Sequence, residues 1–238
     1  MSEYSCKDDI INKIFDDEPN KFFIDVGAFN GVHGSHTLTL EKNFGWDGLC
    51  IEANPDAYAA LENNRKNTCN AAVFSSDGES VDFICDDVPS QGEMMLVQNL
   101  SHAQGGGSGI LNRWCNKRKD VMELRGCKKI SLKTRTMSSI MKDYELPKYI
   151  QLLDIDIEEA DYDALISIDW SSYRFGCILM EQEGSDVENK MIEEGYGIYI
   201  QFIEANMDRL YIDTRNKDIM KRALNLTQDK NLWRFEVL

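Results

Sequence analysis

Apolar residues along this 238-residue chain follow two alternating patterns. Short apolar runs, typical of strands buried in a parallel sheet, alternate with stretches in which apolar residues recur at helical spacing. The sequence predicts strands at Phe22–Val26, 48–52, 70–74, Ser80–Cys85, 128–134, 149–157 and 176–181. It predicts helices at 5–15, 35–43, 56–66, 113–125, 138–144, 162–168 and 186–194. This alternation indicates an α/β protein with a mostly parallel sheet.

The remainder of the chain predicts how this sheet ends and how many domains there are. Two further strands, at 196–204 and Arg209–Ile212, are followed by a short helix from Asn216 and a last strand at Trp233–Val237. No repeat, low-complexity tract or linker interrupts the pattern, so we expect one domain over 1–238. A leading helix within 1–20 is expected on the sheet edge. Residues 86–127 show poor periodicity, and we expect them to form a cap or lid.

Composition and charge narrow the classes of function. The net charge of −15 argues against a protein that grips nucleic acid or an anionic membrane through phosphate contacts. No apolar run approaches the length of a membrane span, and the first residues lack the apolar core of a signal peptide. The seven cysteines include no CxxC pair, which favours a reduced, cytoplasmic protein. We expect a monomer or homodimer that acts on a small molecule or a glycan.

The stretch FFIDVGAFNG, residues 22–31, joins a buried strand to a glycine-rich turn. Gly27 and Gly31 would let backbone amides approach a ligand closely, because glycine has no Cβ. Asp25 sits inside the apolar run, where an unpaired carboxylate would be costly. Glu52 ends the next strand, at the place where an acid accepts the ribose hydroxyls in dinucleotide-type folds. Nicotinamide enzymes have the motif G-x-G-x-x-G at this turn, whereas this chain has only Gly27 and Gly31. This departure weakens the interpretation of the chain as a nicotinamide-dependent dehydrogenase.

Several further motifs surround this turn. A GS-x-T-x-x-LEK helix covers 34–42, GW-x-GLCIE-x-NP follows, and an NR pair precedes the third strand. Residues 22–78 as a whole resemble the FkbM family of S-adenosylmethionine-dependent methyltransferases, and Ser108–Gly109–Ile110 resembles a short element common in that family. The resemblance implies a class I, Rossmann-like fold: a seven-stranded, mostly parallel sheet with a C-terminal antiparallel hairpin and helices on both faces.

The resemblance also implies S-adenosylmethionine as the cofactor, and the strand-end residues then receive roles. We expect the methionine half of the cofactor to be bound by Asp25, Gly27, Phe29, Asn30 and Gly31. Glu52 is assigned to the ribose, because its two oxygens match a vicinal diol. The flanking residues are Ala53 and Asn54, and the adenine contacts are Asn70 and Ala71.

Acidic residues gather at the end of the fourth core strand, 149–157. Alternation places Asp154, Asp156 and Glu158 on one face if the strand continues that far. The family signature I-D-x-E-G-x-E is matched at Asp156, Glu158 and Asp161, whereas Glu159 replaces the glycine. This replacement leaves the conformation of the local turn open.

Two chemical roles are open for these acids. Methyl transfer to a hydroxyl needs aligned reactants and a base, and Asp156 is nearest to the place where a base is wanted. Asp154, Asp156 and Glu181 could instead hold Mg²⁺ or Mn²⁺, which would orient a sugar diol and lower the hydroxyl's pKa. His102 is a third candidate base.

Members of this family methylate hydroxyls of sugars and natural products, so the resemblance implies a carbohydrate acceptor. An acidic crevice with Trp114, Tyr149 and Tyr162 near it in sequence suits a neutral sugar better than a phosphorylated one. Two alternatives are open. One is a non-catalytic interaction module, which the loss of the glycine at Glu159 favours, and the other is a nicotinamide-dependent sugar-modifying enzyme.

Overall fold

A computed structural model describes residues 6–85, 108–113, 127–181, 184–202, 208–226 and 233–237 of the chain. It contains a main sheet of eight strands in the order β12-β10-β11-β9-β8-β1-β2-β3. Its strands are β1 Phe22–Val26, β2 Asp47–Glu52, β3 Thr68–Asn70, β8 Tyr149–Ile155, β9 Arg174–Met180, β10 Ile198–Phe202, β11 Arg209–Ile212 and β12 Trp233–Val237. Five neighbouring strands, β3 to β9 in that order, are parallel, and β11 and β10 form the predicted antiparallel end.

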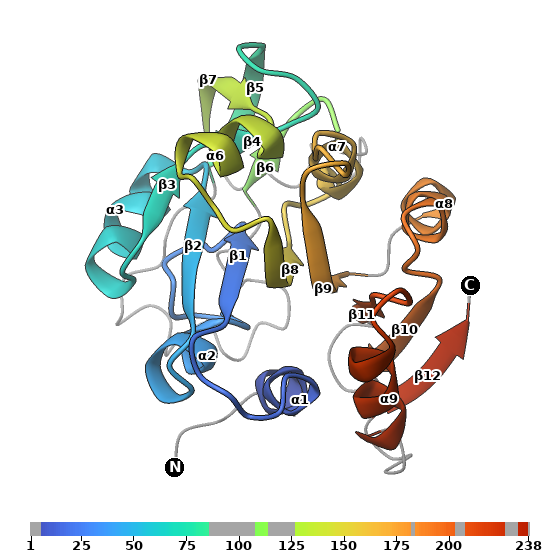
Figure 1. Ribbon diagram of the computed structural model, residues 1–238. Coiled ribbons are helices and arrows are strands. Elements are labelled where there is room, and N and C mark those ends of the chain that lie inside the picture. Colours follow the sequence, from blue (N-terminus) through green and yellow to red (C-terminus); the bar gives the residue numbers. More distant parts are fainter. Residues whose placement is uncertain are drawn as a thin grey trace.

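This topology confirms the predicted fold class. The order β3-β2-β1-β8-β9-β11-β10 is the seven-stranded Rossmann-like sheet, and β12 adds an edge strand antiparallel to β10. Helices cover both faces (Figure 1). They are α1 Cys6–Ile14, α2 Leu38–Asn43, α3 Pro55–Asn64, α6 Met137–Asp143, α7 Asp161–Ile166, α8 Ser185–Glu193 and α9 Lys217–Leu226.

Alternation along the strands creates two apolar cores, one on each face of the main sheet. One core includes Ile24, Leu153 and Ile178 with residues of α6, α7 and α8. The other includes Phe23 and Leu152 with residues of α1, α2, α3 and α9. Since Asp25 and Asp154 lie two residues beyond Phe23 and Leu152, they belong to the second face, near the carboxyl ends of their strands.

The sequence analysis placed the leading helix on the sheet edge, but the structure places it on a face of the sheet. Ile10, Ile11 and Ile14 of α1 are almost fully buried and pack in the core under the central strands. Three adjacent apolar positions need a broad apolar surface, which the face of a sheet provides and its edge does not. As a result, α1 lies between α2 and α9, on the face that carries Asp25 and Asp154 (Figure 1).

A smaller sheet lies beyond the carboxyl ends of β1 and β2 (Figure 1). Its order is β4-β7-β5-β6, with β4 Ala72–Val73, β5 Ser80–Cys85, β6 Gly109–Ile110 and β7 Lys128–Arg135. The single strand expected over 70–74 is therefore wrong: the chain leaves the main sheet after Asn70 and joins the small sheet at Ala72. Of the expected cap over 86–127, only 108–113 and Cys127 are described. None of the described helices has the length and apolar character needed to cross a membrane.

Candidate active site

A pocket of about 1090 Å³, including its open mouth, lies at the carboxyl ends of β1, β2 and β8. The small sheet closes one side of it with Val73, Phe83 and Ile110. The opposite part of the pocket is acidic and is lined by Asp25 and Asp154. One cavity thus joins an apolar end to an acidic end, at the edge where open α/β sheets bind ligands.

The glycine-rich turn shapes this pocket in a way that differs from the prediction. The amides of Gly27 and Ala28 both donate to the Ile51 carbonyl, at 2.9 and 3.0 Å. The Phe29 amide donates to Glu52, and the Gly31 amide donates to the Ala28 carbonyl. These amides therefore bind protein acceptors rather than facing a ligand.

Gly27 is needed for a close backbone approach. Its φ is +92°, and a Cβ there would lie 1.9 Å from the carbonyl oxygen of Asp156. Only a residue without a side chain lets the end of β1 pass so near the chain that leaves β8. Gly31, with φ +76°, packs against the side chains of Leu61 and Arg65 and does not line the pocket.

Asp25 is buried, and hydrogen bonds and charges hold its carboxylate. The hydroxyl of Thr37 donates to it, and a guanidinium nitrogen of Arg65 lies 3.9 Å away. In the register of the parallel sheet, Asp25 pairs with Asp154 on β8. Burial and the neighbouring Asp154 raise the pKa of Asp25 to about 6, against the opposing effects of Arg65 and Thr37. Two adjacent carboxylates in one buried place favour a positively charged ligand group.

Glu52 connects the glycine turn to the start of α3. One carboxylate oxygen accepts from the Phe29 amide at 2.8 Å, and the other accepts from the Asn54 amide at 2.7 Å. Burial raises the pKa of Glu52 to about 7, although these backbone donors oppose the shift. Ala53 contributes a further backbone donor, and the carboxylate keeps acceptor capacity for a ribose hydroxyl.

Asp156 lines the pocket directly after the end of β8. The loss of hydration around the carboxylate is the main effect that raises the pKa of Asp156, to about 7. The charges of Glu158 and Glu181 act in the same direction. The residue is nevertheless open to solvent through the pocket, so water screens part of this effect until a ligand covers it. A carboxylate with a pKa near neutrality suits general-base chemistry.

The turn after β8 keeps a glycine-like conformation without the glycine. The strand ends at Ile155, and Glu158 and Glu159 have φ of +58° and +69°. This left-handed region is unfavourable for residues that carry a side chain. Glu159 therefore adopts a backbone conformation that glycine would adopt with less strain.

Several predicted site residues support the pocket rather than line it. Asn30 accepts the amides of Val32 and His33, and Asn70 donates to the Glu52 carbonyl at 2.7 Å. Asn54 caps α3 and donates to the hydroxyl of Ser108. The predicted positions that do line the pocket are Asp25, Gly27, Phe29, Glu52, Ala53, Ala71, Asp154 and Asp156.

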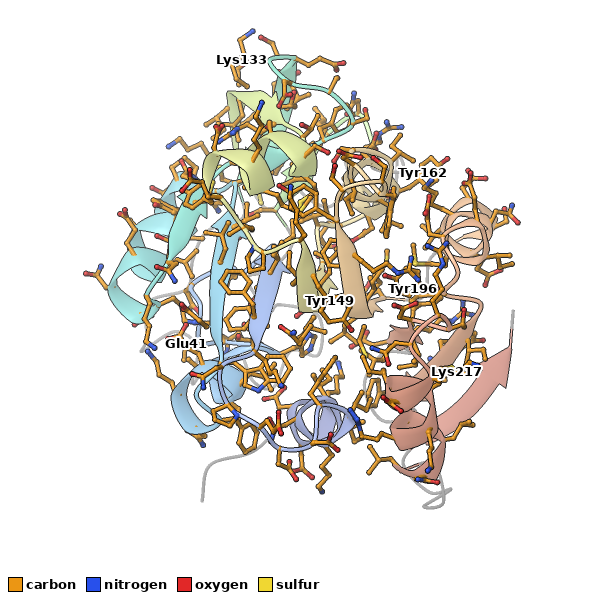
Figure 2. All side chains as sticks on the ribbon, viewed as in Figure 1. Glu41, Lys133, Tyr149, Tyr162, Tyr196 and Lys217 are labelled. Atoms are coloured by element: carbon orange, nitrogen blue, oxygen red, sulfur yellow. The ribbon has the colours of Figure 1, made fainter. Side chains whose placement is uncertain are left out.

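One proposed metal ligand, Glu181, and two aromatic residues lie outside the pocket. Within the described part of the chain, no group of three His, Cys, Asp or Glu side chains has the arrangement of a metal site. Glu181 lies at the exposed end of β9 and does not line the pocket, and Asp154 pairs with a histidine. Tyr149 stands at the far end of β8 and Tyr162 lies on α7, neither of them in the pocket (Figure 2). His102 and Trp114 fall outside the described residues.

Sequence reasoning missed Arg65, which forms hydrogen bonds to several segments next to the pocket. Its side chain has no exposed surface. Its nitrogens donate to Glu41 at 2.9 Å, to Thr37 at 2.9 Å and to the Gly31 carbonyl at 3.2 Å. Arg65 belongs to the NR pair before the third strand, but its role depends on contacts with residues 24 to 40 positions away, which spacing alone does not predict.

Sequence reasoning also missed His36. This residue lines the pocket, and its Nδ1 lies 3.2 Å from Asp154 Oδ2. In the sequence it occupies an unspecified position of the GS-x-T motif. No sequence signal distinguished it, because its partner is 118 positions away.

The strand order and the acidic pocket at the strand ends define a Rossmann-like protein of the methyltransferase class. The family model described as methyltransferase FkbM domain matches residues 25–211, and the chain belongs to this family. A comparison with curated proteins returned no match. Among solved structures, precorrin-6y C5,15-methyltransferase from Geobacter metallireducens GS-15 is similar at 11% identity over 89% of each chain, with a TM-score of 0.38. At that TM-score the likeness adds nothing to the assignment.

Proposed function

We propose that this protein is an S-adenosylmethionine-dependent O-methyltransferase that acts on a hydroxyl of a sugar in a glycan, a deoxyhexose or a glycosylated small molecule. Membership of the FkbM family supports methylation from S-adenosylmethionine in general. The observation that carries the more specific proposal is the pocket itself, whose acidic end contains Asp156 and whose opposite end is apolar.

The pocket suits each part of the cofactor. Val73, Phe83 and Ile110 offer an apolar surface for adenine. Glu52 offers acceptors for the ribose hydroxyls, and the paired carboxylates of Asp25 and Asp154 favour the ammonium of the methionine end. In this arrangement the sulfonium lies between the ribose and the methionine end, on the side of Asp156.

In the proposed reaction, the acceptor oxygen attacks the methyl carbon in line with the sulfonium. The carbon–sulfur bond breaks, its electron pair stays on sulfur, and S-adenosylhomocysteine leaves. Asp156 accepts the hydroxyl proton as the new carbon–oxygen bond forms. Of the three acids considered for Mg²⁺ or Mn²⁺, only Asp154 and Asp156 line the pocket and Glu181 lies outside it, so the proposed reaction uses Asp156 as a base without a metal.

Methyl transfer tests this proposal directly. Wild-type protein and Asp156→Asn are incubated with S-adenosylmethionine labelled in the methyl group and a panel of neutral sugars and glycosides. We expect labelled product with wild type, a rate that rises with pH through about 7, and a loss on the order of 100-fold or more in Asp156→Asn, because general-base catalysis contributes that much.

The controls separate the rival functions. Isothermal titration with S-adenosylhomocysteine should show the same affinity for both proteins, because Asp156 acts on the acceptor. No binding at millimolar ligand would favour a non-catalytic module, and hydride transfer from a nicotinamide would favour a sugar-modifying dehydrogenase. Activity that survives exhaustive chelation would remove the metal role, while activity restored only by Mg²⁺ or Mn²⁺ would support it.

A further inference from the structure

A buried cluster of charged residues lies beside the acidic end of the pocket. Its members are Lys7 on α1, His36 after the glycine turn, Asp154 on β8 and Asp208 just before β11. Lys7, Asp154 and Asp208 are each at most 6% exposed. Four sequence-distant segments thus place ionisable groups together, and burying charges in this way is costly unless the groups are paired.

The contacts form a chain that leads from α1 to the pocket. Lys7 pairs with Asp208, and its Nζ lies 3.0 Å from His36 Nε2. On the other side of the ring, His36 Nδ1 lies 3.2 Å from Asp154 Oδ2. Of these four residues, His36 and Asp154 line the pocket, whereas Lys7 and Asp208 do not.

The geometry defines which nitrogen of His36 carries hydrogen. Burial lowers the pKa of His36 and the Asp154 carboxylate raises it, with a net upward shift. The Lys7 ammonium, however, can only donate, so a ring nitrogen 3.0 Å from it must be an acceptor. We therefore assign a neutral ring in which Nδ1–H donates to Asp154 and Nε2 accepts from Lys7.

We propose that His36 is a positioning residue of the cofactor site: it holds the Asp154 carboxylate toward the amino-acid end of the cofactor, and Lys7 of α1 fixes the ring from behind. This inference rests on the proposed function, because it needs S-adenosylmethionine in the pocket. It adds α1 to the site. The family match covers residues 25–211, so Lys7 lies outside the matched residues.

The sheet explains why Asp154 needs such support. Asp154 stands directly beside Asp25 in the sheet register, and like charges in adjacent buried positions repel. Thr37 and Arg65 hold Asp25 from one side. His36 is the corresponding donor for Asp154, so the two carboxylates keep separate directions and can accept together from one ammonium group.

The test compares two variants of His36 that keep different halves of the ring. In His36→Asn the amide nitrogen can take the place of Nδ1 and donate to Asp154. In His36→Gln the amide reaches toward the place of Nε2 and leaves Asp154 without its donor. Lys7→Met removes the ammonium group that donates to His36 Nε2, and Lys7→Arg is the conservative variant that keeps a charged donor.

Two ligands separate positioning from general damage. S-adenosylhomocysteine contains the amino-acid end of the cofactor, whereas 5′-methylthioadenosine lacks it and keeps the adenosine. Isothermal titration of the full chain should show that His36→Gln weakens S-adenosylhomocysteine binding roughly 10-fold or more, as expected for a lost charge-assisted hydrogen bond. We expect His36→Asn and Lys7→Arg to stay within about 3-fold of wild type, and Lys7→Met to lose about 5-fold. Binding of 5′-methylthioadenosine should be unchanged in every variant.

The outcomes are distinguishable. If wild type binds neither ligand, both the proposed function and this inference fail. If wild type binds both and His36→Gln weakens both equally, or keeps full affinity for S-adenosylhomocysteine, only the positioning role fails. Thermal unfolding identifies any variant that does not fold, and should Lys7→Met be such a variant, the His36 pair still decides.

Discussion

Glu52 is the residue whose predicted role can be tested most directly. Its carboxylate is buried, accepts backbone amides that include those of Phe29 and Asn54, and lines the pocket. We expect Glu52→Gln to weaken S-adenosylhomocysteine binding by about 1–3 kcal/mol, because charged acceptors make stronger hydrogen bonds than neutral ones. Isothermal titration measures this change.

The control for Glu52 is Asn70→Ala, which removes a neighbouring polar group that donates to the Glu52 carbonyl without lining the pocket. It should bind the ligand with nearly wild-type affinity. An unchanged dissociation constant in a folded Glu52→Gln protein would refute the ribose assignment.

At the scale of single residues, the sequence predicted the groups that lie at strand ends. Asp25, Glu52, Asp154 and Asp156 each follow an apolar run, and parallel strands bring such positions to one edge. The sequence could not predict His36, because a residue in an irregular segment has no periodicity that indicates its direction.

At the scale of elements, the turn after β1 depends on Gly27. A Cβ there would overlap the Asp156 carbonyl, and φ of +92° is unfavourable for any other residue. We expect Gly27→Ala to destabilise the fold by more than about 4 kcal/mol, since backbone would have to move. Denaturant unfolding, or the loss of soluble protein, measures the effect.

Gly78→Ala is the matched control for Gly27. Gly78 also has a positive φ, of +77°, but nothing lies within 4 Å of its hypothetical Cβ. Its substitution should cost only about 1 kcal/mol, from the backbone conformation alone. Equal effects of the two substitutions would show that the close approach to Asp156 is unimportant.

In the turn after β8, replacing a residue by glycine should stabilise the protein. Glu159 adopts φ of +69° where the family signature has glycine. Glu159→Gly should stabilise the protein by about 1 kcal/mol, which corresponds to roughly 2–4 °C in Tm at this size. Glu159→Ala is the control, because it removes the same side chain but keeps the strain. A Tm no higher for glycine than for alanine would contradict the strain argument.

The elements themselves were predicted well where periodicity was strong and poorly where tertiary contacts decided. The parallel strands and the C-terminal hairpin follow the apolar pattern closely. The strand expected over 70–74 breaks because Ala72 pairs with β7, more than 60 residues away. Likewise, the helix expected from Ser35 begins at Leu38, because the Ser35 hydroxyl accepts the amides of Thr37 and Leu38.

At the scale of the whole molecule, the buried acids predict how stability depends on pH. Burial raises the pKa of Asp8 to about 7, of Asp25 to about 6 and of Glu52 to about 7. Each folded-state pKa lies above its unfolded value near 4, so the folded protein binds more protons between these limits. The stability contributed by these groups is present below pH 4 and is lost as pH rises through 6 to 7.

Ligand-free protein should therefore melt at a lower temperature at pH 7.5 than at pH 5, by on the order of 5 °C. Scanning calorimetry at constant ionic strength measures the difference. Asp8→Asn is the control, because Asp8 is 1% exposed and does not line the pocket, so the variant should show a shallower slope. S-adenosylhomocysteine should raise Tm more at pH 7.5, where Asp25 and Glu52 are ionised and can accept its ammonium and hydroxyl hydrogens. A Tm that rises from pH 5 to 7.5 without ligand would mean that these carboxylates are already compensated inside the protein. The pocket would then have no electrostatic preference for a cationic cofactor.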